Sequence, residues 1–380
     1  MAQSGKSLLA LVVKSGRSTP YYYVADGVKQ AYIRLGSESV PAPDHILNEL
    51  ILKGTNQTYD AIATEFRKED YSFTLLEATY LQRTKLRFSA TDYHSFGLTT
   101  QDGMLTRAGS LLTDQHIVYN SRVFCTRWNG LEKGSIFDDA LDDKEYEGNL
   151  IHLLQNGCNF VKTNSKVRFA KEAFERVDKP DYADRAVMEA LVNALIHRSY
   201  LVMGSEVHID MYDDRLEISS PGGMFSGKLI QEQDINEIDS ERRNPIIADL
   251  FHRMRYMERR GSGLKRIVNE TSKLPGYSDD LQPIFSSSGS SFRVTIWNMN
   301  YGHAPDVPED VLDVLENVPD SRQMKILQAI AADPFITTAK LAEQFQVTDK
   351  TIKRDLSALK DKGKIQRIGA ERGGHWKVLP

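Results

Sequence analysis

The segment from residue 189 to residue 198 constrains the fold more than any other part of the chain. It reads Glu-Ala-Leu-Val-Asn-Ala-Leu-Ile-His-Arg and contains neither glycine nor proline, so it favours a helix. At a four-residue spacing, Glu189, Asn193 and His197 fall on one face, while the leucines, valine and isoleucine between them form an apolar stripe. We therefore expect an amphipathic helix, within residues 183–199, that presents a carboxylate, an amide and an imidazole on one side.

Two glycine segments follow this helix, Gly222-Gly223 and Gly261-Ser262-Gly263. A carboxylate that polarises water, an amide that holds a cation and glycines that let backbone approach phosphate are the parts of a Mg-nucleotide site. The plain alternative is an ordinary amphipathic helix followed by unrelated turns. The order of the helix and the two glycine segments favours the nucleotide site.

Length and composition predict a globular protein of several domains. The 380 residues are enough for two to four domains, and 41% apolar with 26% charged residues is typical of a folded chain. Cys125 and Cys158 lie far apart without metal-ligand neighbours, so we expect a reducing compartment and no disulfide. The early apolar run at 8–13 is too short for a signal peptide or a membrane span, which predicts a cytoplasmic protein.

The charge is distributed unevenly along the chain. The net charge is −4, but residues 321–380 contain 12 Lys and Arg and six Asp and Glu, a net of +6. Residues 1–320 therefore carry −10. A basic C-terminal module on an acidic body predicts a polyanionic partner at that end alone.

The N-terminal region, residues 1–55, has the pattern of a small sheet. We expect strands at 8–13 and within 21–34, with a hairpin turn at Asp26-Gly27, and a helix at 44–52. Three strands and one helix are too few to bury a core of their own, so this region is expected to be the tail of a domain or a piece docked on its neighbour.

Residues 56–146 predict a mostly helical connecting region. Short helices are expected around 73–83 and 106–112, and a strand at 122–128. The acidic run at 138–147 has no defensible ligand geometry, so we interpret it as a solvated loop or helix face rather than a metal site.

Residues 147–300 predict a larger α+β domain. The expected elements are helices at 147–162, 183–199, 244–256 and after Gly263, a hairpin of 207–212 and 215–219 that turns at Asp213-Asp214, and a strand at 292–297. Antiparallel pairing in the hairpin favours a layered α/β sandwich over a doubly wound parallel sheet. The proline-containing stretch 301–320 is expected to be a linker.

The order Glu-x-x-x-Asn, Gly-Gly and Gly-Ser-Gly resembles the GHKL ATP-binding fold shared by gyrase B, histidine kinases and MutL. The chain is more closely similar to the divergent ATP-binding domain of bacterial proteins known as RecG-related or transcriptional regulators. The resemblance covers residues 147–300 and implies ATP and Mg²⁺ as ligands. It implies that Glu189 is the general base and Asn193 the Mg²⁺ ligand, with His197 and Arg198 one turn further on, within reach of phosphate or ribose.

The glycines receive roles from the same resemblance. Gly222 and Gly223 would form the floor under the nucleotide, and Gly261 and Gly263 would bring backbone N–H groups and a helix N-terminus onto the phosphates. The usual second motif begins with an aspartate that accepts from the adenine amino group, and Ser220 stands at that position. A hydroxyl discriminates less sharply than a carboxylate, which leaves nucleotide specificity and hydrolysis open.

Four arginines lie in or beside the segment that the resemblance makes an ATP lid, with a surface cation as the alternative role for each: Arg242, Arg243, Arg259 and Arg260. The run Ser4-Gly5-Lys6-Ser7 imitates the end of a P-loop but lacks its first glycine and precedes a strand. We therefore do not expect a helicase motor, whatever the RecG label suggests.

Residues 321–380 predict a winged helix-turn-helix. We expect helices at 321–332, 338–345 and 349–362 and strands at 364–368 and 375–379, with a glycine-rich tip between the strands. The segment 338–359 resembles a bacterial repressor-type winged helix. That resemblance places Lys350, Thr351, Lys353 and Arg354 on the recognition helix and Arg372 in the wing, in contact with double-stranded DNA. The alternative is a winged helix used for protein contact or dimerisation.

The N-terminal segments Pro20-Tyr21-Tyr22-Tyr23 and 31–36 resemble the closing part of a Schlafen/AlbA-like DNA-binding domain. Residues 1–55 are therefore expected to be a partial domain. The strand at 8–13 would then be an exposed sheet edge through which a homodimer could form. We interpret Tyr21–Tyr23 as strand packing rather than as base-stacking residues.

The modules together favour an ATP-binding, DNA-binding transcriptional regulator. One alternative is a weak ATPase that acts in DNA processing or defence. Another is a DNA-binding protein with a degenerate nucleotide pocket. Phosphate release and nucleotide binding distinguish these three hypotheses.

Overall fold

The computed structural model describes residues 18–35, 38–171, 176–238, 241–258, 261–302, 321–345, 347–368 and 375–378. The chain divides into two compact units, Met1–Ala304 and Pro305–Pro380. Each unit has its own buried cluster of apolar side chains. The fold is therefore α+β and multidomain, as the sequence predicted.

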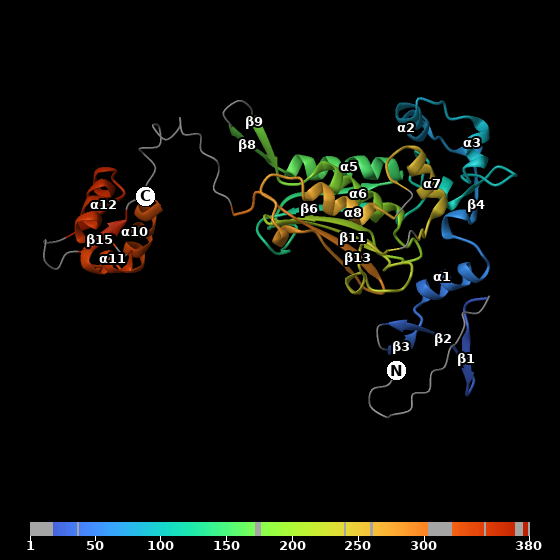
Figure 1. The fold of residues 1–380 in the computed structure, drawn as a ribbon, viewed down its shortest axis with the longest axis horizontal. Helices are drawn as coiled ribbons and strands as arrows, with labels where there is room; N and C mark the ends of the chain where they lie inside the picture. Colours follow the sequence, from blue (N-terminus) through green and yellow to red (C-terminus); the bar gives the residue numbers. More distant parts are fainter. Residues whose placement is uncertain are drawn as a thin grey trace. The chain divides into compact units, whose positions relative to one another are not determined.

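A six-stranded sheet forms the centre of the first unit, in the order β12-β13-β11-β10-β6-β7 (Figure 1). Its strands are β6 (Arg122–Trp128), β7 (Ala140–Glu147), β10 (Val207–Met211), β11 (Arg215–Pro221), β12 (Ile284–Ser287) and β13 (Ser291–Trp297). β6 and β10 run parallel, while every other pair of neighbours in this sheet is antiparallel. The predicted hairpin and the last predicted strand of this domain are confirmed.

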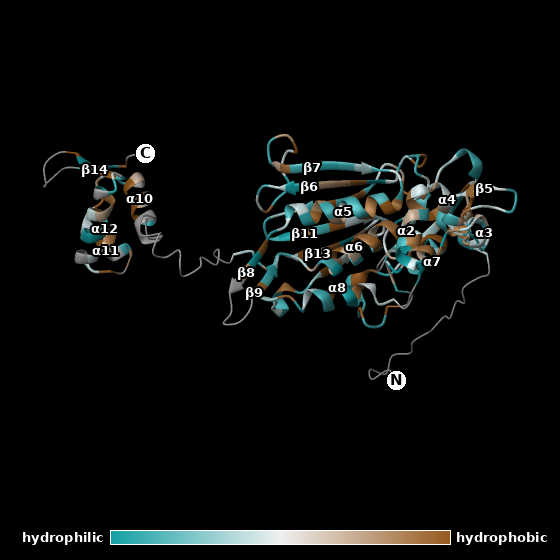
Figure 2. Cartoon of the chain, turned by 90° about the horizontal axis from the view of Figure 1, so that it is seen from above, coloured by the Kyte–Doolittle hydropathy of each residue, from teal (hydrophilic) through white to brown (hydrophobic). Residues whose placement is uncertain are grey.

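Three helices cover one face of this sheet, namely α5 (Leu150–Asn164), α6 (Asp184–Ile196) and α8 (Gly263–Thr271) (Figures 1 and 2). Alternate strand residues such as Val207, Ile209 and Ile218 are fully buried and face the helices. The apolar stripe of α6, with Leu191, Val192 and Leu195, is also fully buried. In this two-layer arrangement α6 packs on the sheet and is flanked by α5 on one side and α8 on the other.

Smaller elements complete the first unit. They are α1 (Asp44–Gly54), α2 (Thr74–Thr84), α3 (Ala90–Ser95), α4 (Arg107–Ser110), α7 (Pro245–Arg253), the antiparallel strand pair β4 and β5 (Ala63–Arg67 and Met104–Thr106), and the antiparallel pair β8 and β9 (Val167–Lys171 and Arg176–Pro180). Asp60 joins two of these parts, because its buried carboxylate accepts from the backbone N–H groups of Ile246 (2.7 Å) and Ile247 (3.2 Å) at the start of α7.

The acidic run at 138–147 was wrongly interpreted as a loop or helix face. It forms the edge strand β7, whose residues pair with β6 from Arg122↔Glu147 to Trp128↔Ala140. Arg122 bonds two of its carboxylates, Glu145 at 3.0 Å and Glu147 at 3.2 Å. The many charged residues made this strand hard to predict. They are tolerated because one face of an edge strand is open to water.

The expected boundary at 146/147 also falls inside a structural unit. β6 and β7 lie in the region assigned to a mostly helical connection, yet they extend the same sheet as β10 and β11. The reason is the parallel pairing of β6 with β10, which joins segments about 80 residues apart and leaves no local sequence pattern. The sheet therefore starts at residue 122.

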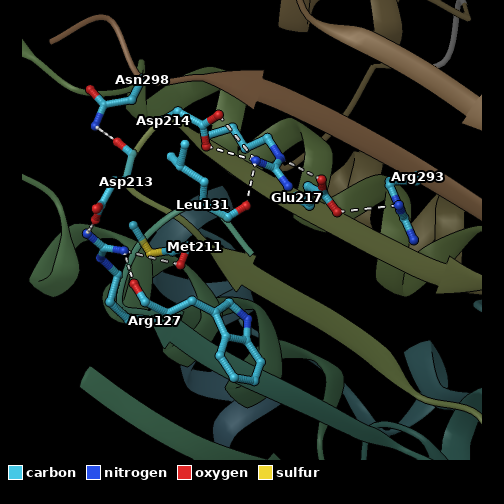
Figure 3. A network of polar contacts seen from close by, with 10 residues as sticks. Arg127, Leu131, Met211, Asp213, Asp214, Glu217, Arg293 and Asn298 are labelled. Atoms are coloured by element: carbon cyan, nitrogen blue, oxygen red, sulfur yellow. Dashed lines mark hydrogen bonds and ion pairs between the residues drawn. The ribbon is translucent and has the colours of Figure 1, made fainter. Parts of the chain in front are cut away.

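A polar network holds the turn between β10 and β11, at the opposite end of β11 from the glycine segment (Figure 3). Arg215 bonds Glu217 (2.7 Å), Asp214 (2.9 Å) and the carbonyl of Leu131 (3.2 Å). Arg127 bonds Asp213 at 2.5 Å. These arginines are both bonded to other parts of the sheet and its turns, so their role at this end of the sheet is to stabilise the fold.

The N-terminal sheet is small and exposed. It consists of β1 (Tyr22–Ala25), β2 (Val28–Leu35) and β3 (Glu38–Pro41), with the hairpin turn at Asp26-Gly27, where both residues have positive φ. The interpretation of its tyrosines as packed was wrong, since Tyr21 and Tyr23 are about 60% exposed. The strand expected at 8–13 lies outside the described residues.

The second unit contains α10 (Ser321–Ala332), α11 (Thr338–Gln344), α12 (Asp349–Asp361) and the hairpin β14–β15 (Ile365–Ile368 and His375–Val378). Leu341, Ile352 and Leu356 are buried between these elements, on the faces that the helix-turn-helix pattern predicted. Residues 303–320 of the linker expected at 301–320, and the glycine-rich tip expected at 369–374, lie outside the described residues.

Candidate functional site: the junction of α6 and α8

Helix α6 places Glu189 and Asn193 one turn apart on the same side, as expected. The Glu189 side chain is only 3% exposed, and Asn193 is partly buried. An unbroken helix fixes their spacing, because α6 has no glycine or proline and its apolar stripe is packed on the sheet. The backbone positions of the two residues are therefore fixed relative to each other.

The N-terminus of α8 lies directly against this pair. A Cβ atom added to Gly263 would come within 2.9 Å of Asn193 Nδ2 and 2.9 Å of Glu189 Oε1. Gly261, two residues earlier, has φ +66° and so adopts a backbone conformation that favours glycine. The second glycine segment thus brings backbone into contact with the carboxylate and the amide, whereas Arg259 and Arg260 lie outside the described residues.

Arg266 completes this cluster, and the sequence reasoning missed it. Its Nη1 lies 3.3 Å from Glu189 Oε2, and its Nη2 bonds Glu258. Burial raises the pKa of the Glu189 carboxyl, while the positive charge of Arg266 opposes that rise. The signal was available, because Arg266 follows Gly263 by three residues and so shares its helix face.

The first glycine segment lies just past the C-terminal end of α6. Gly222 has φ +90°, and a Cβ there would lie 2.7 Å from the Cβ of Ser199, just past the helix. A Cβ on Gly223 would lie 2.1 Å from the carbonyl oxygen of Ser288. Ser220, buried at the end of β11, precedes this turn. Both glycines are needed because neighbouring chain segments approach too closely for a side chain.

Arg243 clamps this end of the site together. Its Nη1 donates to the carbonyl of His197 (2.6 Å), its Nη2 donates to the carbonyl of Gly223 (2.9 Å), and its Nε bonds Glu49 on α1 (2.6 Å). The Arg243 side chain is 9% exposed. The guanidinium therefore ties the glycine turn, the end of α6 and the N-terminal helix to one another, which excludes the surface-cation role.

His197 and Arg198 have different surroundings from those expected. Burial and the charges of Arg243 and Arg242 lower the pKa of His197 to about 4, so its ring is neutral at pH 7. The fully buried Arg198 donates to the carbonyls of Asn120 (2.9 Å) and Ser205 (2.8 Å). Its guanidinium serves the fold, and we leave Arg198 out of the proposed nucleotide site.

Two cavities lie near the C-terminal end of α6, and both are lined in part by Phe225 and Arg243. One, of about 670 Å³, is lined by residues that include Gly223, Phe225 and Lys53, and the other, of about 190 Å³, by residues that include Ser199 and Tyr59. Neither includes Glu189, Asn193 or Gly263 in its lining. The larger cavity thus lies beside the Gly222-Gly223 turn, and the smaller one lies beside Ser199, just past the end of α6.

The α6–α8 junction fits a Mg-nucleotide in its chemistry. Gly263 leaves room for backbone where a side chain would collide, and Asn193 offers the amide oxygen that a hard cation prefers. Within the described ranges no group of three or more His, Cys, Asp or Glu could hold a metal ion without further ligands. A magnesium ion here would therefore depend on Asn193 and on the phosphates themselves.

The second unit presents the expected recognition helix, α12. Thr348 caps it by accepting from the N–H of Thr351, and Lys353 and Arg354 are exposed on the helix. Lys350 lies in its first turn. Arg372 lies outside the described residues, so the expected wing contact stays a prediction.

Comparisons with known proteins agree with this division. Residues 204–296 match a family model described as "Putative ATP-dependent DNA helicase recG C-terminal", and residues 322–374 match the DeoR-like helix-turn-helix domain. The chain thus joins a RecG C-terminal-like ATPase domain to a DeoR-like helix-turn-helix domain, the combination expected of a RecG-related regulator.

Among solved structures, the chain is similar to the DIP2311 protein from Corynebacterium diphtheriae. The TM-score is 0.54 at 19% identity, over 93% of this chain and 70% of that one. This likeness concerns the fold alone. A comparison with curated proteins found no match. Within the part of the chain that the structure describes, every helix is too short or too polar to cross a lipid bilayer.

Proposed function

We propose that this chain is a DNA-binding regulator whose GHKL-like site binds Mg-ATP at the junction of α6 and α8. The observation that supports it most is the close approach of Gly263, which lies within the residues that match the ATPase-like family model, to Glu189 and Asn193 on the preceding helix α6. Asn193 would hold the magnesium ion and the start of α8 would face the phosphates. Ser220 and the Gly222-Gly223 turn would lie under the base.

Nucleotide binding in this site would have to move the start of α8. Gly263 approaches Glu189 and Asn193 closely enough that a phosphate cannot lie between them. A phosphate would therefore reach Asn193 only if the Gly261–Gly263 segment shifts outward. Mg-ATP would then bind the shifted arrangement of this segment better than the unshifted one, and such a difference in affinity is what allows a ligand to change the state of a protein.

Binding of Mg-ATP to the full chain tests the site. We expect saturable heat in titration calorimetry, reduced at least about tenfold in affinity by Asn193→Ala, which removes the proposed metal ligand. Asn269→Ala, an exposed position on α8, is the matched control and is expected to bind as the wild type does. A wild-type chain that is folded and binds no nucleotide would contradict the proposal.

DNA binding and its coupling to the nucleotide need a separate measurement. Lys350, Thr351, Lys353 and Arg354 on α12 would contact a duplex, which the chain itself can select from a random pool. The affinity for that duplex is then measured with and without Mg-ATP. Equal affinities would end the idea of coupling while leaving both binding sites intact.

A second function, weak ATP hydrolysis, is favoured by the buried Glu189. Its raised pKa and its place beside Asn193 suit a general base that accepts a proton from water. Steady-state phosphate release should then fall to background in Glu189→Ala. A folded wild type that binds ATP but releases no phosphate would leave regulation without turnover.

A further inference from the structure

Arg266 bridges two carboxylates of very different exposure. Its Nη1 bonds Glu189, whose side chain is 3% exposed, and its Nη2 bonds Glu258, whose side chain is 56% exposed. Arg266 itself is mostly buried, at 19%. The guanidinium is therefore anchored at one end in the interior and held at the other end by a group that water can replace.

The two carboxylates differ in what their loss would cost. If Arg266 left Glu189, a nearly fully buried carboxylate would lose its bonded cation, which is strongly unfavourable. The Glu258 carboxylate can instead turn into solvent, because its side chain is more than half exposed and water can replace its bonds. Nη2 is thus the end of Arg266 that can take a new anionic partner.

A triphosphate near Asn193 would bring negative charge close to Glu189. Such charges repel unless a cation lies between them. Arg266 is already bonded to Glu189 and shares the helix face of Gly263, which contacts Asn193. Its planar group can hold two anions at once, which a lysine ammonium does less well.

We propose that Arg266 recognises the terminal phosphate of a nucleoside triphosphate, exchanging Glu258 for that phosphate at Nη2 while Nη1 stays on Glu189. The proposal rests on the proposed nucleotide site and specifies its ligand. Arg266 makes the site selective for a triphosphate over a diphosphate, and Glu258 competes with the third phosphate. Arg266 is thus the specificity-determining residue of the site: its Nη2 bonds the third phosphate of a triphosphate and stays on Glu258 when a diphosphate is bound.

The test compares the affinities of the full chain for a non-hydrolysable ATP analogue and for ADP, both with Mg²⁺, by titration calorimetry. Arg266→Ala should lower the affinity for the analogue by about tenfold or more and the affinity for ADP by less than about threefold. Glu258→Gln should raise the affinity for the analogue and leave the affinity for ADP unchanged, because a neutral amide competes less for the guanidinium. Lys273, an exposed cation two residues past the C-terminal end of α8, provides the matched control, and Lys273→Ala should change neither affinity.

Loss of Arg266 leaves Glu189 buried without its bonded cation, so a second pair of variants guards against misfolding. Glu189→Gln removes the buried charge, and Glu189→Gln/Arg266→Ala removes both partners. The ratio of analogue to ADP affinity should fall about tenfold between these two variants, with circular dichroism confirming that both are folded.

The outcomes separate this proposal from the one on which it rests. A folded wild type that binds neither nucleotide overturns both. A wild type that binds both nucleotides, with equal losses for both in Arg266→Ala and no gain in Glu258→Gln, overturns only the role of Arg266. That pattern would show that Arg266 merely neutralises Glu189.

Discussion

At the scale of single residues, a glycine controls the geometry of the candidate site. Gly263 is the position where α8 meets the ends of the Glu189 and Asn193 side chains. Those ends are flexible, so an added methyl group would push them aside rather than unfold the chain. The substitution Gly263→Ala therefore separates an effect on the site from an effect on the fold.

For Gly263→Ala we expect the melting temperature to stay within about 3 °C of the wild type, because alanine is the better helix former and offsets the displacement. Mg-ATP affinity should fall at least about tenfold, since both side chains are displaced. Calorimetry and thermal melting measure the two effects. A large loss of stability with intact nucleotide affinity would contradict this reading of the contact.

A second residue, His197, makes stability depend on pH. Its folded pKa of about 4 lies below the ordinary value of about 6.5, so only the unfolded state takes up the proton between these values. Its contribution is complete above pH 6.5 and is lost as the pH falls toward 4, with a slope of at most about 1.4 kcal/mol per pH unit.

Urea unfolding of wild type and His197→Gln at several pH values isolates this contribution. The difference in unfolding free energy between the two proteins should shrink as the pH falls from 6.5 to 4. Glu189, whose folded pKa is raised, acts in the opposite direction and is common to both proteins, so it cancels. A constant difference across that range would show that His197 titrates normally in the fold.

At the scale of elements, Arg243 joins α1, the end of α6 and the first glycine turn. Arg243→Ala leaves Glu49 and two carbonyl oxygens without their donor, so we expect a loss of about 2–4 kcal/mol in unfolding free energy. Lys273→Ala removes an exposed pair with Glu270 and should cost less than about 0.5 kcal/mol. Denaturant unfolding of both variants provides the comparison, and similar losses would show that Arg243 is no clamp.

The elements also show what the sequence could predict. Helix α6, the hairpin β10–β11 and the three helices of the second unit follow from local periodicity, and their predicted ranges agree with the structure within a few residues. Strand β7 was missed because its charges hide the alternation, and the membership of β6 in the sheet was missed because its partner is distant in sequence.

The site divides in the same way. Glu189, Asn193 and Gly263 could be predicted as neighbours because helix spacing and glycine carry local signals, and in the structure Gly263 lies so close to both side chains that an added Cβ would collide with them. Arg243 was considered only as a lid or surface cation, and Arg266 was missed, because their roles depend on partners from other elements. The expected ligand role of Arg198 failed for a related reason, since its packing against residues 120 and 205 is invisible in one helix.

At the scale of the whole molecule, the basic unit offers a direct test of DNA binding. Lys353→Ala and Arg354→Ala should each lower duplex affinity and reduce the slope of log affinity against log salt by about one, because each removes one phosphate contact. Lys325→Ala, an exposed lysine on α10, is the control and should leave the slope unchanged. Equal effects of all three would indicate a nonspecific response to net charge.

The parallel pairing of β6 with β10 also governs how the protein can be cut. A recombinant fragment that begins at residue 204, where the match to the ATPase-like family model begins, would contain β10 with one row of backbone donors and acceptors uncovered. In the full-length chain this edge is covered as soon as β10 is synthesised, because its partner β6 comes earlier in the sequence. Expression limits for the isolated domain should therefore be set upstream of residue 122, and a shorter fragment is expected to form intermolecular sheets.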